Sequence, residues 1–218
     1  KECTYSAGGK GLNVSRVGAI AGEEITATGF VGGHAGAYVI EELEKWGIKS
    51  DFINVRGESR SCINIYDEEN KTQTEFLEPG VTVTKEDQKR LLDKYEKLVE
   101  DHSIVTISGS VPKGVASQIY LDMINIAKKR GKKVILDTSG KLLEDAVLAK
   151  PTMIKPNIDE IQMLAGREIK DRADLIRMAE DLQRQGIEIV VVSLGKEGSI
   201  IVSDQGIFQA IVPKIEAV

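Results

Sequence analysis

The sequence contains few of the residues that mark several large classes of protein. It has two cysteines, Cys3 and Cys62, and two histidines, His34 and His102, in 218 residues, and aromatic residues make up only 5%. Two distant cysteines cannot supply a disulfide framework or a zinc site. We therefore expect reduced thiols in a cytoplasmic protein. Neither histidine has neighbours that suggest a triad or a metal site, so both are interpreted as structural.

The chain also lacks an excess of positive charge and a long apolar run. It carries 29 basic and 34 acidic residues, which gives a formal net charge of −5, so no broad surface for nucleic acid or an anionic membrane is expected. No apolar stretch reaches 18 residues, and no signal-peptide pattern is recognisable. Any anion must therefore be bound by a local cluster of donors.

The chain shows two different patterns of apolar and polar residues. Residues 52–78 alternate apolar and polar side chains between charged turns, which predicts a β-meander with one solvent-facing side. From Thr84 onward, short apolar strands alternate with amphipathic helices, which predicts a parallel sheet with helices on both faces. Helices are expected at the glycine-rich start and over 36–46, 85–100, 115–130, 141–149, 158–165 and 173–185, and strands over 25–33, 104–108, 133–137, 152–156 and 188–194, followed by a terminal pair.

The expected strands end in loops of one chemical character. In open α/β sheets, ligands bind beyond the carboxyl ends of the strands. The loops there are rich in Gly, Ser, Asn, Asp and Lys, which suit phosphates and sugar hydroxyls, although turn chemistry alone explains part of this. The segments are GG at 32–33, SGSVPKG at 108–114, DTSG at 137–140, KPNIDE at 155–160 and SLGKEG at 193–198.

The opening AGGKGLN is a glycine loop that fits neither common nucleotide motif. Lys10 is followed by Gly11 instead of Ser or Thr, which excludes a Walker A loop, and Asn13 breaks the GxGxxG spacing. What remains is a backbone whose N–H groups can converge on an anion or a hydroxyl ahead of a helix. A plain glycine turn with a surface lysine is the alternative.

Three further signals each allow two interpretations. Asn157 and Glu160 can form a capping box or organise Mg²⁺ near nucleotide phosphates, and spacing alone favours the cap. The loop SLGKEG is a nucleotide loop or a tight hairpin. Arg60 is a solvated charge or a partner for a substrate phosphate. No Ser, Cys and His arrangement supports nucleophilic catalysis.

Eight segments, in order, resemble the ribokinase-like carbohydrate kinases over essentially the whole chain: AGGKGLNVSR, GFVGG, GESRSCINI, EFLEPG, SGSVPKG, LDTSG, IKPNIDE and VVSLGKEG. The branch that they resemble most holds 1-phosphofructokinase and tagatose-6-phosphate kinase. The resemblance implies an α/β fold, a three-layer α/β/α sandwich with a mainly parallel sheet and a small β-sheet lid. Residues 1–7, with a strand at Cys3–Ser6, and 52–78 would form the lid, which can mediate a homodimer, and residues 8–51 and 79–218 the core.

The same resemblance implies a role for each matching residue. It assigns the sugar phosphate to five residues, ATP to six, and an indirect, water-mediated contact with Mg²⁺ to two. These are Gly9, Lys10, Asn13, Arg60 and Ser110 for the sugar phosphate; Lys155, Asn157, Glu160, Ser193, Gly195 and Gly198 for ATP; and Glu160 and Asp137 for Mg²⁺.

The implied activity is ATP-dependent phosphoryl transfer to fructose 1-phosphate or tagatose 6-phosphate, giving the corresponding 1,6-bisphosphate. The partners are then a sugar phosphate and ATP, with no nucleic acid and no membrane. A non-catalytic sensor of the same ligands on the same fold is the alternative. The family's Gly-x-Gly-Asp, which carries the catalytic base, is expected beyond Val218, and its first strand before Lys1. We therefore expect no catalytic residue in these 218 residues, an incomplete core, and no activity from the chain alone.

Overall fold

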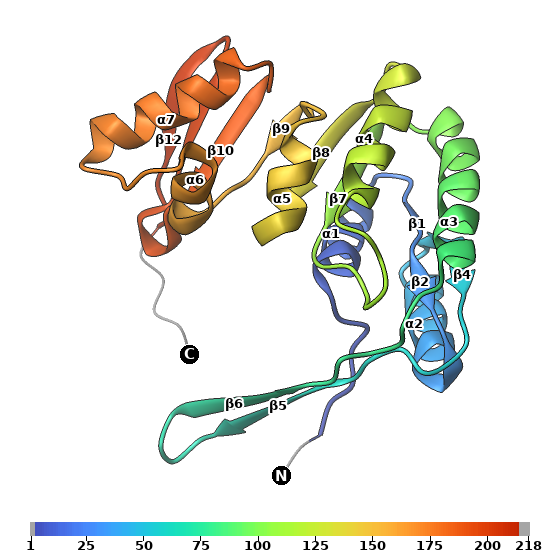
Figure 1. Cartoon of the computed structure of the whole chain (residues 1–218). Coiled ribbons are helices and arrows are strands. Elements are labelled where there is room, and N and C mark those ends of the chain that lie inside the picture. Colours follow the sequence, from blue (N-terminus) through green and yellow to red (C-terminus); the bar gives the residue numbers. More distant parts are fainter. Residues whose placement is uncertain (1–2, 214–218) are drawn as a thin grey trace. The chain divides into compact units, whose positions relative to one another are not determined.

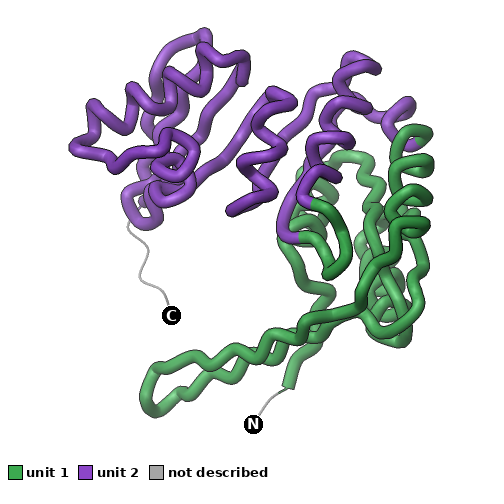
Figure 2. Tube along the Cα trace, in the orientation of Figure 1, with its two compact units in different colours: residues 1–97, 111–116 green, residues 98–110, 117–218 purple. Residues whose placement is uncertain are grey.

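The computed structural model describes residues 3–213, and contacts divide the chain into two compact units (Figure 2). Unit 1 comprises the chain up to Lys97 together with Val111–Ala116. Unit 2 comprises Leu98–Ser110 and the chain from Ser117 onward. The expected division into a lid and a core is drawn differently and stays a prediction.

From residue 3 onward, unit 1 contains three helices and six short strands. Their order along the chain is α1 (Lys10–Ile20), β1 (Thr26–Ala27), β2 (Phe30–Val31), α2 (Gly33–Lys45), β3 (Lys49–Ser50), β4 (Ile53–Asn54), β5 (Cys62–Asp67), β6 (Thr72–Leu77) and α3 (Lys85–Leu98).

A small core joins the first half of unit 1. Strand β1 pairs in parallel with β3, and β2 pairs in parallel with β4. Ala27, Leu43 and Ile48 are buried together, with partly buried apolar side chains around them. The single strand expected over residues 25–33 is instead two strands, because the backbone at Gly29 turns to a φ of 150° between them.

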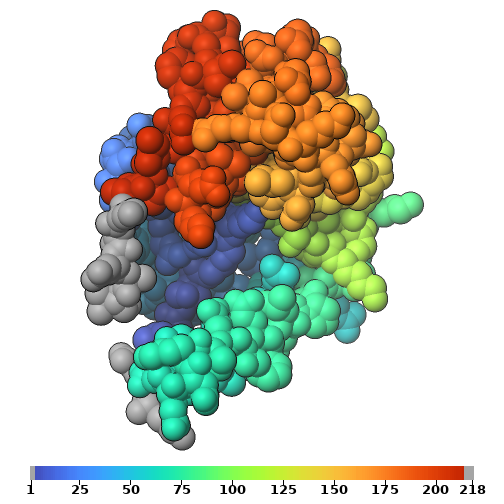
Figure 3. All heavy atoms as spheres, turned by 90° about the vertical axis from the view of Figure 1, so that its left-hand side faces the viewer, coloured from blue at the N-terminus to red at the C-terminus, as the bar shows by residue number. Residues whose placement is uncertain are grey.

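The expected meander is reduced to one antiparallel hairpin, β5–β6. Strand β4 does not extend it, because β4 already pairs with β2. The prediction of one covered side was also wrong: all of β6 is exposed, as is β5 except at its last residue, Asp67. Figure 1 shows the hairpin extending away from α2 and α3 of the same unit, and Figure 3 shows one side of it without covering atoms. Residues 3–8 form no strand, so the strand expected at Cys3–Ser6 is not found.

Unit 2 is a continuous α/β sheet. Its elements are β7 (Ile104–Ser108), α4 (Ile119–Lys129), β8 (Lys133–Asp137), α5 (Gly140–Val147), β9 (Met153–Ile154), α6 (Ile158–Ala165), α7 (Arg172–Arg184), β10 (Ile189–Ser193), β11 (Ser199–Ser203) and β12 (Gly206–Ala210), with short 3₁₀ turns at Val99–Asp101 and Gly195–Glu197.

The six strands of unit 2 lie in the order β12-β11-β10-β9-β8-β7. From β7 to β10 each strand is parallel to the next, whereas β11 and β12 are antiparallel additions. Crossovers between neighbouring parallel strands are right-handed, so four consecutive strands place all their connecting helices on one face. Helices α4–α7 thus form one helical layer of the predicted sandwich (Figure 1).

Burial along the strands agrees with this single helical layer. On one face Val134, Leu136, Val190 and Val192 are fully buried. On the other face the alternating residues, such as Ile135, are only half-buried. Side chains alternate between the two faces of the sheet, so the residues on one face are covered by helices and those on the other face are partly open to solvent.

Helix α4 begins later than the sequence predicts. The expected span started at residue 115, but residues 111–116 form a loop that pairs with the segment before α3. Val83 N–H donates to the Lys113 carbonyl at 2.8 Å, and Thr82 and Lys113 form an isolated parallel bridge. Within the expected span, Ala116 N–H donates to Gln88 Oε1 of α3 at 3.3 Å, so this backbone group bonds to another segment and not within a helix.

None of the helices in the described part of the chain is both long enough and apolar enough to cross a membrane.

Two buried tyrosines predict opposite effects on stability. The Tyr95 hydroxyl in α3 is buried and has no hydrogen-bond partner within the described residues, whereas the Tyr120 hydroxyl in α4 donates to the Gly109 carbonyl at 3.2 Å. Burial raises the pKa of Tyr120 to about 12 and that of Tyr95 further, so both stay neutral. We expect Tyr95→Phe to raise the free energy of unfolding by about 1 kcal/mol and Tyr120→Phe to lower it by about the same amount.

Urea unfolding of the two variants and the wild type measures both changes. A loss of stability in Tyr95→Phe equal to that in Tyr120→Phe would show that the Tyr95 hydroxyl does have a partner.

Candidate active site

One edge of the sheet in unit 2 gathers polar loops. The four parallel strands β7–β10 end at this edge with Ser108, Asp137, Ile154 and Ser193. Ser108 and Asp137 stand opposite each other in the ladder. The loops predicted to bind ligand in this half of the chain therefore begin on neighbouring strands.

A lysine and a carboxylate pair at the centre of this edge. Lys155 Nζ lies 3.5 Å from Asp137 Oδ2, and the two side chains are 41% and 19% exposed. The Lys155 amide also donates to the Leu136 carbonyl at 3.2 Å, which ties the end of β9 to β8. The ion pair holds a cation at the rim while leaving much of it accessible to solvent.

The capping box predicted at the start of α6 is present. Glu160 N–H donates to Asn157 Oδ1, and Asn157 N–H donates to Glu160 Oε2, both at 2.8 Å. This arrangement satisfies two backbone donors at the helix start.

The loop SLGKEG forms the hairpin turn between β10 and β11, which was one of its two interpretations. Ser193 N–H donates to the Pro156 carbonyl at 2.9 Å, which places this turn next to the start of α6. Leu194 N–H donates to the Gly198 carbonyl at 2.8 Å and closes the turn. A side chain at Gly198 would overlap the Ala210 carbonyl, so only glycine fits.

Ser110 follows β7 and is exposed. Two residues that the sequence did not single out hold the turn before it. The Gly109 carbonyl accepts from Thr138 Oγ1 at 2.7 Å and from the Tyr120 hydroxyl at 3.2 Å. Thr138 is 2% exposed. The signal available in the sequence was a Thr directly after the Asp that ends the expected strand, in DTSG.

The glycine loop of unit 1 leads directly into α1. Gly9 is the N-cap residue, with a φ of 121° that other residues rarely adopt, and no side chain caps the helix. Lys10 and Asn13 both lie in the first turn, and all three residues are exposed. Asn13 Oδ1 accepts from the Arg16 guanidinium. The positive end of the helix dipole therefore lies beside a lysine.

Arg60 stands in the segment between β4 and β5, also in unit 1, and is exposed. Its neighbour Ser61 donates its N–H to Glu78 Oε2 at 2.8 Å, just beyond β6. A Cβ added at Gly80 would lie 3.2 Å from Arg60 Cβ, so the stem of Arg60 runs over this glycine.

The predicted site residues thus fall into two groups. Gly9, Lys10, Asn13 and Arg60 belong to unit 1, and Ser110 belongs to unit 2 with all the residues expected to bind ATP or Mg²⁺. In unit 2 the structure brings the ends of neighbouring strands together. Each group is therefore assessed within its own unit.

The donor set in unit 2 fits a magnesium ion that is held indirectly. No group of three or more His, Cys, Asp or Glu residues within residues 3–213 could hold a metal ion directly. Mg²⁺ at phosphates is commonly bound by one or two carboxylates together with waters and substrate oxygens. Asp137 and Glu160 supply two such carboxylates near the same sheet edge.

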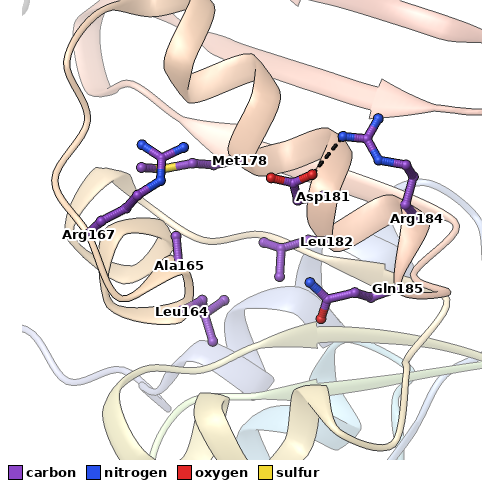
Figure 4. A pocket seen from close by; sticks show the side chains of 8 residues that line it. All are labelled: Leu164, Ala165, Arg167, Met178, Asp181, Leu182, Arg184 and Gln185. Atoms are coloured by element: carbon purple, nitrogen blue, oxygen red, sulfur yellow. Dashed lines mark hydrogen bonds and ion pairs between the residues drawn. The ribbon is translucent and has the colours of Figure 1, made fainter.

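A separate pocket of about 440 Å³ lies in the helical layer of unit 2 (Figure 4). It lies between the carboxyl-terminal end of α6 and the second half of α7, whereas Asn157 and Glu160 are at the opposite end of α6. Asp181 and Arg184 form an ion pair across its wall. It is lined by Leu164, Ala165, Arg167, Met178, Asp181, Leu182, Arg184 and Gln185.

Next to this pocket, Asp174 braces the loop from α6 to α7. It is almost fully buried and accepts hydrogen bonds from Arg167, the Lys170 amide and Arg177. These donors, Arg167 foremost, hold the pKa of its carboxyl well below the usual range. The acidic side chains Asp174 and Asp181 are thus paired with arginines of the same region.

Comparison with known proteins decides the family. The model of the pfkB family of carbohydrate kinases matches residues 1–218. The chain belongs to this family. Tagatose-6-phosphate kinase from Staphylococcus epidermidis is 38% identical over 220 residues, which is 100% of this chain and 70% of that protein.

Solved structures of two proteins named as phosphofructokinases, one of them as a possible one, share the fold. Phosphofructokinase-2 from Escherichia coli, in complex with substrates and products, is 28% identical with a TM-score of 0.90. The match covers 96% of this chain and 68% of the phosphofructokinase-2 chain. A possible 1-phosphofructokinase from Thermotoga maritima is 35% identical with a TM-score of 0.83, and the match covers 92% of this chain and 64% of the Thermotoga maritima chain. The predicted ribokinase-like α/β fold and carbohydrate-kinase class are confirmed.

Two substitutions separate the cap at α6 from the predicted magnesium role. Asn157→Ala removes the cap and should lower the free energy of unfolding by about 1 kcal/mol. Glu160→Gln keeps a side chain that serves in a capping box but removes the charge, so stability should change by less than about 0.5 kcal/mol. If Glu160 helps to organise Mg²⁺, this variant should need a higher Mg²⁺ concentration for half-maximal activity.

Urea unfolding and Mg²⁺ titration of the intact protein provide the two measurements. An unchanged Mg²⁺ requirement in Glu160→Gln would contradict the magnesium role, and unchanged stability in Asn157→Ala would contradict the cap.

Proposed function

We propose that this pfkB kinase transfers the γ-phosphoryl group of ATP to a phosphorylated ketohexose. The products would be fructose 1,6-bisphosphate from fructose 1-phosphate, or tagatose 1,6-bisphosphate from tagatose 6-phosphate. The observation that carries the proposal is the edge of the unit 2 sheet, where Asp137, Lys155, Asn157, Glu160 and Ser193 lie on or next to the ends of adjoining strands.

Each group at this edge has a role in the proposed transfer. Lys155 would neutralise phosphate charge, while the glycine-rich turn that contains Ser193, Gly195 and Gly198 would contact the nucleotide. Phosphoryl transfer depends mainly on positioning and electrostatic stabilisation, which is what such a rim supplies. Mg²⁺, held through water by Glu160 and Asp137, would neutralise charge on the phosphates. We assign the general base to none of the described residues.

The sugar phosphate is assigned chiefly to the glycine loop and Arg60 of unit 1, with Ser110 from unit 2. Two cations, Lys10 and Arg60, suit a substrate that already carries a phosphate, because ammonium and guanidinium groups form charge-assisted hydrogen bonds with phosphate oxygens. The relatives agree with this class: one is named a tagatose-6-phosphate kinase, and phosphofructokinase-2 has been solved with fructose-6-phosphate. Tagatose 6-phosphate is therefore the first substrate to test.

Steady-state kinetics of the intact protein test the substrate class. We expect KM values for tagatose 6-phosphate or fructose 1-phosphate at least about 100-fold below that for fructose, since two charge-assisted contacts are lost with the phosphate. Lys10→Ala should raise KM for the sugar phosphate by about 10-fold or more and leave KM for ATP nearly unchanged.

A preference for fructose, or a larger effect of Lys10→Ala on ATP, would refute the assignment. Tight binding of both ligands in calorimetry without any transfer would favour the sensor interpretation.

We also propose that the hairpin β5–β6 associates with a second copy of the chain. Ile63, Ile65 and Phe76 share one face of the hairpin and are 57%, 53% and 57% exposed. An isolated two-stranded hairpin is marginally stable in water, and an exposed apolar patch marks an interaction surface. A solved form of phosphofructokinase-2 is described as tetrameric, which is a property of that relative.

Analytical ultracentrifugation tests this association. Phe76→Glu should weaken self-association at least about tenfold, because it places a charge on the apolar face. Gln73→Lys, on the opposite face of the same hairpin, is the matched control and should change little. Equal effects of the two variants, or a monomeric wild type, would reject the proposal.

A further inference from the structure

The start of helix α2 is capped by a residue from a distant segment. Gly32 is the N-cap residue and offers no side chain. Glu58 Oε1 instead accepts a hydrogen bond from the Ala35 amide at 2.5 Å. A side chain at Gly33, which has a φ of 65°, would overlap the Glu58 carboxylate. Glu58 therefore takes the place that a capping Asp or Ser occupies in most helices.

The next residue strengthens this attachment. Ser59 N–H donates to the Gly32 carbonyl at 2.8 Å, and Ser59 Oγ accepts from Gly32 N–H at 3.0 Å. A Cβ at Gly32 would lie 2.5 Å from the Gly57 carbonyl oxygen, so the two backbones are in direct contact. Residues 57–59 thus pack directly against the GFVGG segment. This close contact explains why Gly32 and Gly33 carry no side chain.

Arg60 comes directly after this attachment and directly before a second one. On its other side, Ser61 exchanges hydrogen bonds with Glu78, through its N–H at 2.8 Å and its carbonyl at 3.3 Å. The arginine is itself exposed. Its backbone is therefore held on both sides by hydrogen bonds of its neighbours.

We infer that Glu58 is a positioning residue that sets the orientation of Arg60 by attaching residues 57–59 to the start of α2. The inference rests on the proposed function, in which Arg60 binds the phosphate of the sugar. Bidentate recognition of a phosphate by a guanidinium requires a defined geometry, and an arginine on a free loop must lose conformational freedom on binding. Glu58 would remove that loss before the substrate arrives.

The test combines kinetics with a double-mutant cycle in the intact protein. Glu58→Ala should raise KM for the sugar phosphate about tenfold, with KM for ATP and kcat changed less than about twofold. Glu58→Gln should keep KM within about threefold of the wild type, because its amide oxygen can still accept from Ala35. In an Arg60→Ala background, Glu58→Ala should add less than about twofold.

Asp171→Ala is the matched control for the loss of a cap. Asp171 caps α7 in unit 2 by accepting from the Asp174 amide at 2.7 Å, far along the chain from Arg60. It should lower the melting temperature about as much as Glu58→Ala and leave KM for the sugar phosphate unchanged.

Two results would overturn the inference while leaving the proposed function intact. One is an unchanged KM for the sugar phosphate in Glu58→Ala. The other is that Glu58→Ala raises this KM by the same factor in the wild type and in the Arg60→Ala variant, while Arg60→Ala alone raises it strongly. An Arg60→Ala variant with unchanged KM would refute the phosphate role of Arg60 and the positioning role together.

Discussion

Parallel pairing of β7 to β10 is the constraint on which most of the candidate site depends. Because each strand neighbours the next and every crossover is right-handed, the four carboxyl ends reach one edge and the helices cover one face. Residues separated by more than fifty positions, such as Asp137 and Ser193, thereby lie on one row of strand ends. Hydrogen bonding of the backbone thus places these side chains before any of them contacts a ligand.

Much of unit 2 could be predicted from the sequence, since its signals are local and agree with one another. Apolar runs such as KVILD fixed the strands, and Asn157 with Glu160 marked a helix start that the structure confirms. The carboxyl-end rule then identified the loops without any knowledge of contacts. The misplaced start of α4 is the exception, because the hydrogen bond of the Ala116 amide with Gln88 is tertiary and leaves no local trace in the sequence.

Unit 1 was harder to predict for the same physical reason. The alternation of apolar and polar residues over 52–78 correctly predicted strands. Such alternation does not indicate which strand will pair with which, and β4 pairs with β2. It also predicts a covered face that the hairpin lacks within the described chain. Glu58 and Glu78 gave no signal at all, because an acidic residue that accepts a hydrogen bond from a distant backbone amide looks like any surface charge in the sequence.

The capping box at α6 has a consequence for how the family's sequences can vary. Asn157 and Glu160 satisfy the first turn of a helix at the rim of the sheet, so their identities are restricted by folding whether or not a ligand is present. A homologue that had lost its activity could keep both residues for stability alone. Retention of this pair is therefore weak evidence of a working enzyme, because the helix start alone is enough to restrict both identities.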